Sequence, residues 1–248
     1  MISHISLSSA DRSLSGDSVS NFTYRLPAPL RDVVAVSVEA VSIPVSWYMI
    51  IQGYNDTIDM EAASTVYTAT IPVGNYTTSE LATAVQTACR SAFSPNNDHT
   101  CTFNNTTQKF TIANPTTAHT LNWSTSSAEL LLGWTLNTDT SSANTHVAPN
   151  LFNLSGSNFI YIMSKELAAN TNIYGSNFRS TLMVLNQDQT FGTYISYENQ
   201  GQYWVHRYSE GKNLYQIDFQ LLFSDGQQID LNGLNWDICL RIERTTKL

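Results

Sequence analysis

Histidine is the residue type in this chain best suited to proton transfer or metal binding near neutral pH. The five histidines are widely dispersed, at positions 4, 99, 119, 146 and 206. None lies three or four residues from another histidine, aspartate or glutamate within a predicted helix, so the usual zinc-binding spacings are missing. The sequence also has no Gly-x-Ser-x-Gly motif and no glycine-rich phosphate loop. The histidines therefore predict neither a catalytic base nor a metal site.

Paired carboxylates can hydrolyse glycosides or bind calcium. Two acidic clusters stand out: Asp56, Asp59 and Glu61 lie close together, and Asp225 and Asp230 flank a predicted hairpin. Neither cluster completes an EF-hand pattern, and turns commonly carry aspartate for local hydrogen bonds. The sequence leaves open that folding brings acids from distant strands together. We interpret the protein as not an enzyme, with no catalytic residues, no cofactor and no metal site.

The aromatic residues favour a different kind of function. Five tryptophans and twelve tyrosines in a chain with few charges suit broad contact surfaces, because these side chains bury a large area at low entropic cost. A place in the core is the other explanation for many of them. His206 lies in an alternating aromatic segment on the same face as Trp204, and we interpret it as a packed or interface histidine.

The overall composition narrows the class of protein. Only 13 % of the 248 residues are charged, about half of the usual share, and the formal net charge is −8. This acidic balance argues against specific nucleic-acid binding. The cysteines Cys89, Cys101 and Cys239 form no Cys-x-x-Cys pair, which favours a reducing compartment. The N-terminus lacks a secretory signal pattern and no apolar run is long enough for direct membrane insertion.

Strands must position any functional residue, because threonine, valine, isoleucine and aromatic residues are plentiful and strong helix formers are scarce. The serine-rich residues 1–21 predict a flexible N-terminal arm. From residue 34 apolar residues alternate, which predicts a strand that ends near Pro44. We expect residues 22–248 to form one domain.

A segment of different character interrupts these strands. Thr77 and Glu80 have the spacing of a capping box, and the apolar residues that follow recur with a helical period. The pattern predicts an amphipathic helix that ends before Pro95.

Two short strands follow this helix, at 101–104 and 109–113. The capping spacing of Ser126 and Glu129 then predicts a small second helix that stops at Gly133. Together with a strand before the first helix, these elements predict an inserted α/β segment at about residues 64–136.

The last hundred residues give the clearest pattern. Phe159–Met163 and residues 182–185 are continuous apolar runs, as expected for covered strands. Residues 215–223 and 234–242 alternate between apolar and polar side chains. Strands with one apolar and one polar face, separated by turns, predict a mainly β protein in which two antiparallel sheets pack as a β-sandwich.

Several stretches resemble a known family. They are TATIPVGNYTTSELATAVQTA, FNNTTQKFTI and AELLLGW, together with FTYRLPAPLRDVVAVSVEAVSIPVSWYMI and FQLLFSDGQQIDLNGLNWDICLRIER. This pattern resembles that of penton and other minor capsid proteins of the double-jelly-roll DNA virus lineage, which includes virophages, polinton-like viruses and large eukaryotic DNA viruses. The resemblance covers roughly residues 20–245, and its motifs are turns and strand ends.

The resemblance implies an antiparallel jelly-roll that forms a homopentamer at the five-fold vertices of an icosahedral shell. It also implies contacts with trimers of a separate double-jelly-roll major capsid protein and with other minor capsid proteins. The protein would then belong to a virion assembled inside the host cell. We expect residues 1–21 to run along the inner shell and to become ordered only on assembly. The inserted segment would form either an outward tower or part of the pentamer contact.

Two alternative functions remain open from the sequence. A jelly-roll protein can also act as a minor capsid cement protein between major capsid trimers. A glycan-binding spike or lectin-like β-sandwich is the other possibility, in which Trp123 or Trp204 would bind the sugar.

Overall fold

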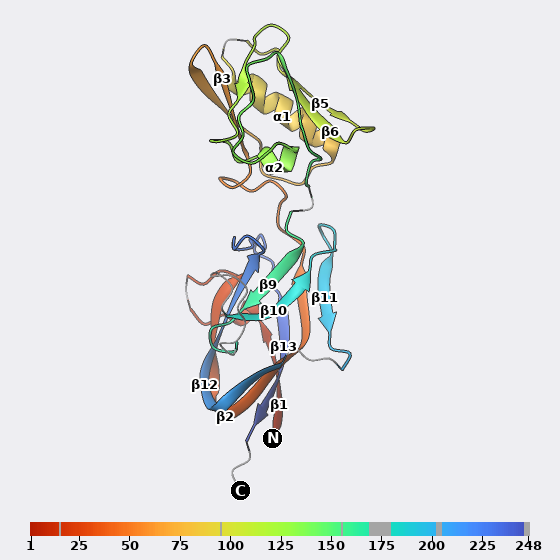
Figure 1. The fold of residues 1–248 in the computed structure, drawn as a ribbon. Coiled ribbons are helices and arrows are strands. Elements are labelled where there is room, and N and C mark those ends of the chain that lie inside the picture. Colours follow the sequence, from red (N-terminus) through yellow and green to blue (C-terminus); the bar gives the residue numbers. More distant parts are fainter. Residues whose placement is uncertain (15, 95, 155, 169–179, 202–204, 246–248) are drawn as a thin grey trace. The chain divides into compact units, whose positions relative to one another are not determined.

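The structure is a computed structural model, and it divides into two compact units (Figure 1). The sandwich unit combines Met1–Trp47 with Ser157–Leu248, and the inserted unit is Tyr48–Gly156. Each unit has its own strands and is described by itself. The residues that the structure describes are 1–14, 16–94, 96–154, 156–168, 180–201 and 205–245.

The strands of the sandwich unit form one antiparallel sheet in the order β1-β13-β2-β12-β9-β10, and β11 pairs with the end of β2. A short 3-10 helix, Ser9–Asp11, follows the first strand. The strands are Ile2–Ser8 (β1), Asn21–Pro44 (β2), Phe159–Met163 (β9), Thr181–Asn186 (β10), Tyr194–Glu198 (β11), Val205–Phe223 (β12) and Asp237–Arg244 (β13).

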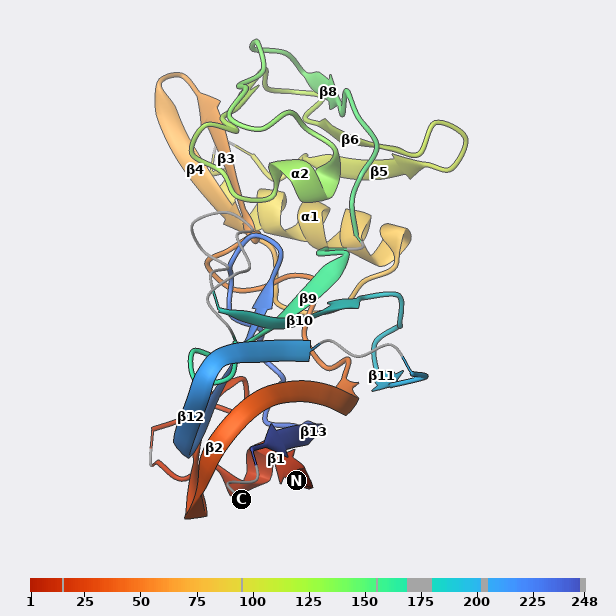
Figure 2. The same ribbon diagram turned by 60° about the horizontal axis from the view of Figure 1, so that its bottom comes forward.

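The long strands β2 and β12 bend and carry the sheet back over itself (Figure 2). At one bend, Tyr215 stands opposite the four residues 26–29, which include two prolines that have no N–H to donate to a partner strand. The first half of β12 then reaches β10, where Nε2 of His206 donates to the carbonyl of Leu182 at 2.8 Å. The predicted β-sandwich is confirmed, but β2 and β12 join layers that the alternation had suggested were separate sheets.

Trp236 lies at the centre of an aromatic cluster in the core of the sandwich unit. Its ring centroid lies 5.9 Å from that of Phe22 and 5.6 Å from that of Phe219, and all three side chains are buried. The indole N–H donates to the carbonyl of Val19 at 2.8 Å, so the one polar atom of the ring is satisfied. The remaining core is mainly valine, isoleucine and leucine from β2, β12 and β13.

The N-terminus differs from the expected flexible arm at residues 1–21. Strand β1 pairs with β13 along its whole length. Leu7 is only 4 % exposed, and the buried hydroxyl of Ser9 accepts a hydrogen bond from the backbone N–H of Trp236 at 3.0 Å. The physical reason is that β13 offers an open sheet edge, so a few inward-facing apolar residues suffice for pairing despite the serine-rich composition.

The inserted unit contains two three-stranded antiparallel sheets, β4-β3-β7 and β5-β6-β8. Helix α1 packs against β4 of the first sheet and β5 of the second (Figure 2). In the part of the chain that the structure describes, no helix has the length and apolar character needed to cross a membrane. The elements are Thr57–Ala62 (β3), Thr65–Thr70 (β4), Thr78–Ala92 (α1), Thr100–Asn104 (β5), Lys109–Ala113 (β6), Thr120–Leu121 (β7), Glu129–Leu132 (α2) and Thr145–Val147 (β8).

The capping box at the start of α1 is confirmed. The hydroxyl of Thr77 accepts from the backbone N–H of Glu80 at 3.3 Å, and the carboxylate of Glu80 accepts from the N–H of Thr77 at 2.9 Å. The helix ends at Ala92, before Pro95 as predicted. The two strands predicted after it are present as β5 and β6.

The predicted second helix is present as α2 and stops at Gly133, but its predicted serine cap is wrong. The N-cap is Ala128 and makes no side-chain hydrogen bond. The hydroxyl of Ser126 instead donates to the carbonyl of Asn122 at 2.7 Å and accepts from the N–H of Asp59 at 2.9 Å. Ser126 therefore ties the loop to β3 rather than starting the helix.

The inserted unit spans Tyr48–Gly156, which is wider than the segment expected at about residues 64–136. Ile58 and Met60 of β3 are fully buried in the same cluster as α1, and Ala148 joins them from the other end. Ile58, Met60 and Ala62 of β3 alternate with Asp59 and Glu61, and the expected segment did not include this strand. The backbone N–H of Asp59 and the carboxylate of Glu61 hydrogen-bond to the loop before α2.

Candidate functional site

The acidic residues near the start of the inserted unit have structural partners. Asp56 is buried and accepts from a backbone N–H of the preceding turn at 3.1 Å. Asp59 accepts from the hydroxyl of Thr68 at 2.6 Å, and Glu61 accepts from the side-chain amide of Asn122 at 3.1 Å. Asp56 and Asp59 therefore fasten nearby segments, and Glu61 holds the distant loop that contains Asn122.

The second acidic pair serves turns, as the sequence suggested. Asp225 accepts from the N–H of Gln227 at 2.9 Å, and Asp230 accepts from the N–H of Asn232 at 2.8 Å. Among the described residues, no group of three or more histidine, cysteine, aspartate or glutamate side chains is arranged to hold a metal ion.

Three of the dispersed histidines meet in the inserted unit, which the sequence did not predict. His99, His119 and His146 are all buried, and their rings stack in a row. The centroids of His99 and His119 are 4.8 Å apart, and those of His119 and His146 are 4.7 Å apart, both in edge-to-face geometry. Phe93, just after α1, packs against His99, with 4.6 Å between the two ring centroids. We call these three residues the histidine cluster.

Hydrogen bonds fix the protonation of the cluster. Nδ1 of His99 lies 3.2 Å from the amide nitrogen of Asn114, and the Asn114 oxygen accepts from two backbone N–H groups. The amide nitrogen must therefore donate, and Nδ1 of His99 must accept. Nδ1 of His119 faces a carbonyl at 3.3 Å, and Nε2 of His146 donates to the carbonyl of His119 at 2.9 Å. Nε2 of His99 and of His119 are buried and have no hydrogen-bond partner among the residues that the structure describes.

Burial keeps the cluster uncharged at neutral pH. Burial lowers the pKa of His99 to about 4, and the nearby His119 and Arg90 act in the same direction. Burial also lowers the pKa of His119 to about 4, helped by His146. The pKa of His146 is lowered by burial as well, although its hydrogen bonds to carbonyls oppose the shift.

The other histidines and the cysteines have separate environments. Nδ1 of His4 lies 2.8 Å from a carboxylate oxygen of Glu39 on the exposed face of the sandwich unit. His206 is buried and hydrogen-bonded, which confirms its interpretation as a packed histidine. Burial raises the pKa of Cys89 to about 12 and also raises that of Cys101, so both thiols stay protonated and unreactive.

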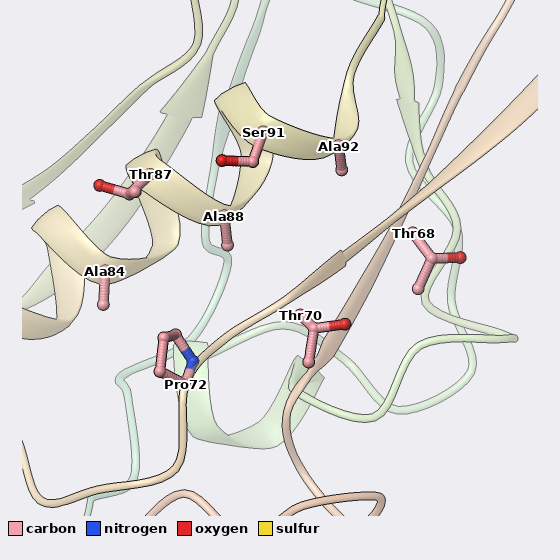
Figure 3. Close-up of a pocket in the computed structure, with 8 residues that line it drawn as sticks. All are labelled: Thr68, Thr70, Pro72, Ala84, Thr87, Ala88, Ser91 and Ala92. Atoms are coloured by element: carbon pink, nitrogen blue, oxygen red, sulfur yellow. The ribbon is translucent and has the colours of Figure 1, made fainter.

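A groove of about 470 Å³ lies between β4 and α1 (Figure 3). Small methyl and hydroxyl groups line it, and none of its lining residues carries a charge. No histidine, lysine, cysteine or carboxylate stands among the lining residues, so the lining holds no base that would activate these hydroxyls. The lining residues are Thr68, Thr70, Pro72, Ala84, Thr87, Ala88, Ser91 and Ala92.

One of the two tryptophans proposed to bind a glycan lies in the core. Trp123 is fully buried in the inserted unit, with its ring centroid 4.8 Å from that of Trp134. Trp204 lies outside the described residues. Large exposed side chains do occur elsewhere, including Tyr194 and Tyr215 of the sandwich unit.

The strands define a mainly β protein, a jelly-roll β-sandwich with an inserted α/β unit. A similar fold occurs in the crystal structure of the selenomethionine-labelled mavirus penton protein, with a TM-score of 0.50 and 11 % sequence identity. The similarity covers 99 % of this chain and 100 % of that chain. No protein-family model and no curated protein sequence matches the chain.

Proposed function

We propose that this protein is a structural capsid protein that forms homopentamers at the five-fold vertices of an icosahedral shell. The observation that carries the proposal is the similarity to the mavirus penton protein, which extends over nearly the whole of both chains, including the inserted unit. A similarity that covers both chains almost completely supports a common architecture more strongly than a match of the β-sandwich alone.

The surface of the sandwich unit is suited to assembly. A ring uses a heterologous interface, in which one patch of a copy binds a different patch on the next copy. The sheet ends in two different outer strands, β1 and β10, and Tyr194 and Tyr215 are exposed on β11 and β12. Few charges need to be desolvated when such surfaces are covered, because only 13 % of the residues are charged. The proposed partners are further copies of this chain, a double-jelly-roll major capsid protein and other minor capsid proteins.

The oligomeric state of the purified full-length chain tests the proposal. Native mass spectrometry should detect a species of about five times the chain mass of 27.6 kDa. A stable dimer or trimer would contradict the pentamer. Because weak rings form only at high effective concentration, the chain should also be co-expressed with the major capsid protein. Electron microscopy of the particles should then place it at the five-fold vertices, and density only between trimers would instead indicate a cement protein.

Glycan binding gives a different result in a separate assay. If the chain is a vertex protein without lectin activity, a glycan array should show no binding by the purified protein. Specific binding that survives a change in salt would favour the spike or lectin function. Trp123→Ala is unsuitable for this test, because Trp123 belongs to the core.

A further inference from the structure

The histidine cluster gathers three ionisable rings in the interior of the inserted unit. We infer that these histidines form an acid-sensitive switch, which keeps the inserted unit closed at neutral pH and opens it at pH 5 to 6 while the sandwich unit stays folded. The inference goes beyond the proposed function and does not depend on it, because it concerns the isolated chain.

Protonation of His99 removes a specific hydrogen bond. The Asn114 amide nitrogen donates to Nδ1 of His99 and also to Oδ1 of Asn96 at 2.7 Å, so it joins the start of β5 to the end of β6. A proton on Nδ1 would place two donors 3.2 Å apart. Asn114 cannot flip to offer its oxygen, because that oxygen already accepts from Thr116 and Thr117. Charging His99 therefore breaks this connection.

Protonation of His119 leaves a charge without a partner. Nδ1 of its ring faces the carbonyl of Thr117, so the added proton goes to Nε2, which is buried and finds no acceptor in the described part of the chain. An uncompensated charge in the interior is strongly unfavourable, and the adjacent ring of His146 would repel it once that ring is charged as well.

The surroundings offer little compensation. From α1, Arg90 donates to the backbone carbonyl of His99 at 2.6 Å and brings a further positive charge. Asp98 is the acidic group that acts on His99, and it accepts a hydrogen bond from the hydroxyl of Thr116. From β4, Tyr67 reaches the cluster only through Phe93. Asp98 therefore acts on His99 against the charge of Arg90, and the backbone carbonyls that accept from His119 and His146 are the other groups that favour the charged rings.

The direction of the pH effect follows from proton linkage. In the unfolded chain these histidines take up protons below pH 6.5, whereas in the folded unit the pKa values of His99 and His119 are about 4. The unfolded state thus binds more protons between these values, so stability is lost as the pH falls from 6.5 towards 4. Between pH 7 and pH 5 the folding equilibrium of the unit should fall by roughly 20-fold for each of these two histidines.

Hydrogen exchange of the full chain at pH 7, 6 and 5, corrected for intrinsic exchange rates, tests the switch. Amides of α1, β5 and β6 should lose protection at pH 5, and amides of β13 should keep it. Loss of protection to the same extent in both units, or in neither, would overturn the inference. NMR titration of the histidine rings in the unaltered protein gives a second test. The rings of His99 and His119 should stay neutral while the inserted unit is folded and should take up protons together with its loss of protection. Protonation of both rings near pH 6.5 with the unit still protected would overturn the inference.

A matched pair of variants separates the cluster from buried histidines in general. His119→Phe keeps an aromatic ring of similar shape but cannot take up a proton, so the loss between pH 7 and pH 5 should be roughly 20-fold smaller. His206→Phe removes the buried histidine of the sandwich unit and should leave the pH dependence of the inserted unit unchanged. An unchanged acid response in His119→Phe would overturn the switch. If that variant fails to fold, the ring titration of the unaltered protein still decides.

Discussion

Gly133 shows how one residue fixes the end of α2. Its φ is +87°, in the left-handed region, and a Cβ atom placed there would lie 2.6 Å from the carbonyl oxygen of Asn150. Because both atoms belong to or are attached to the backbone, neither can move aside easily. The backbone N–H of Asn150 donates to the carbonyl of Gly133 at 3.0 Å, so the same contact holds the chain that returns from β8.

Replacement of Gly133 should therefore destabilise the inserted unit by two effects. Gly133→Ala adds conformational strain of about 1 kcal/mol and an overpacking penalty of roughly 1–3 kcal/mol. Gly53→Ala is a matched control in the same unit, because Gly53 has φ of +71° with open space around it. Urea denaturation followed by tryptophan fluorescence should show the larger loss in Gly133→Ala. Equal losses in the two variants would contradict the close contact.

The histidine cluster could not be predicted from the sequence. His99, His119 and His146 are separated by 20 and 27 positions, and each precedes or lies in a different short strand. Motif searches detect ligands that share one helix or one turn, so such a cluster carries no local signal. The role of Asp225 and Asp230 in turns could be predicted from the sequence, because each accepts a hydrogen bond from a backbone N–H only two residues further along the chain.

Among the elements, β1 differs most from what the sequence predicts, because a paired strand replaces the expected flexible arm. The strand has a polar outer side, and Ile2 near the chain end is 51 % exposed, whereas Leu7 is 4 % exposed against the core. If β1 is a stable edge strand, Leu7→Ala should destabilise the sandwich unit by about 2–5 kcal/mol. Ile2→Ala on the same strand should change the stability by less than about 0.5 kcal/mol.

Thermal unfolding of the two variants decides between a docked strand and a loose arm. A docked β1 requires a clear drop in the Tm of Leu7→Ala and almost none in that of Ile2→Ala. Small and equal changes of the Tm in both variants would instead support the flexible arm expected for residues 1–21. In the docked case, deletion of β1 would uncover the edge of β13 and favour aggregation.

Local signals predicted the elements that depend on local contacts. The capping box of Thr77 and Glu80 starts α1 because both hydrogen bonds close within one turn. The serine cap proposed for α2 failed because Ser126 found a partner on β3, which is 67 residues away in the sequence. The sequence pattern also did not predict that β2 and β12 run through both layers of the sandwich. This connection depends on register shifts between the two strands, which the alternation of apolar and polar residues does not encode.

The molecule as a whole contains two hydrophobic cores, and this sets the boundaries of the insertion. The core of the inserted unit draws on Ile50, Ile58 and Met60 before residue 64 and on Ala148 after residue 136. The sequence pattern marked only the centre of this unit, because β3 alternates apolar and polar residues in the same way as strands of the sandwich unit such as β13.

The structural limits, residues 48–156, and the limits expected from the sequence, residues 64–136, predict different behaviour of the corresponding fragments. Residues 48–156 contain every member of the core cluster and should fold alone, with helical circular dichroism and a cooperative thermal transition. Residues 64–136 lack β3 and β8, so α1 would lose Ile58 and Met60 and leave an apolar face exposed to water. This shorter fragment should be unfolded or aggregated. Cooperative unfolding of residues 64–136 would show that β3 is dispensable and that the sequence-based limits describe the folding unit better.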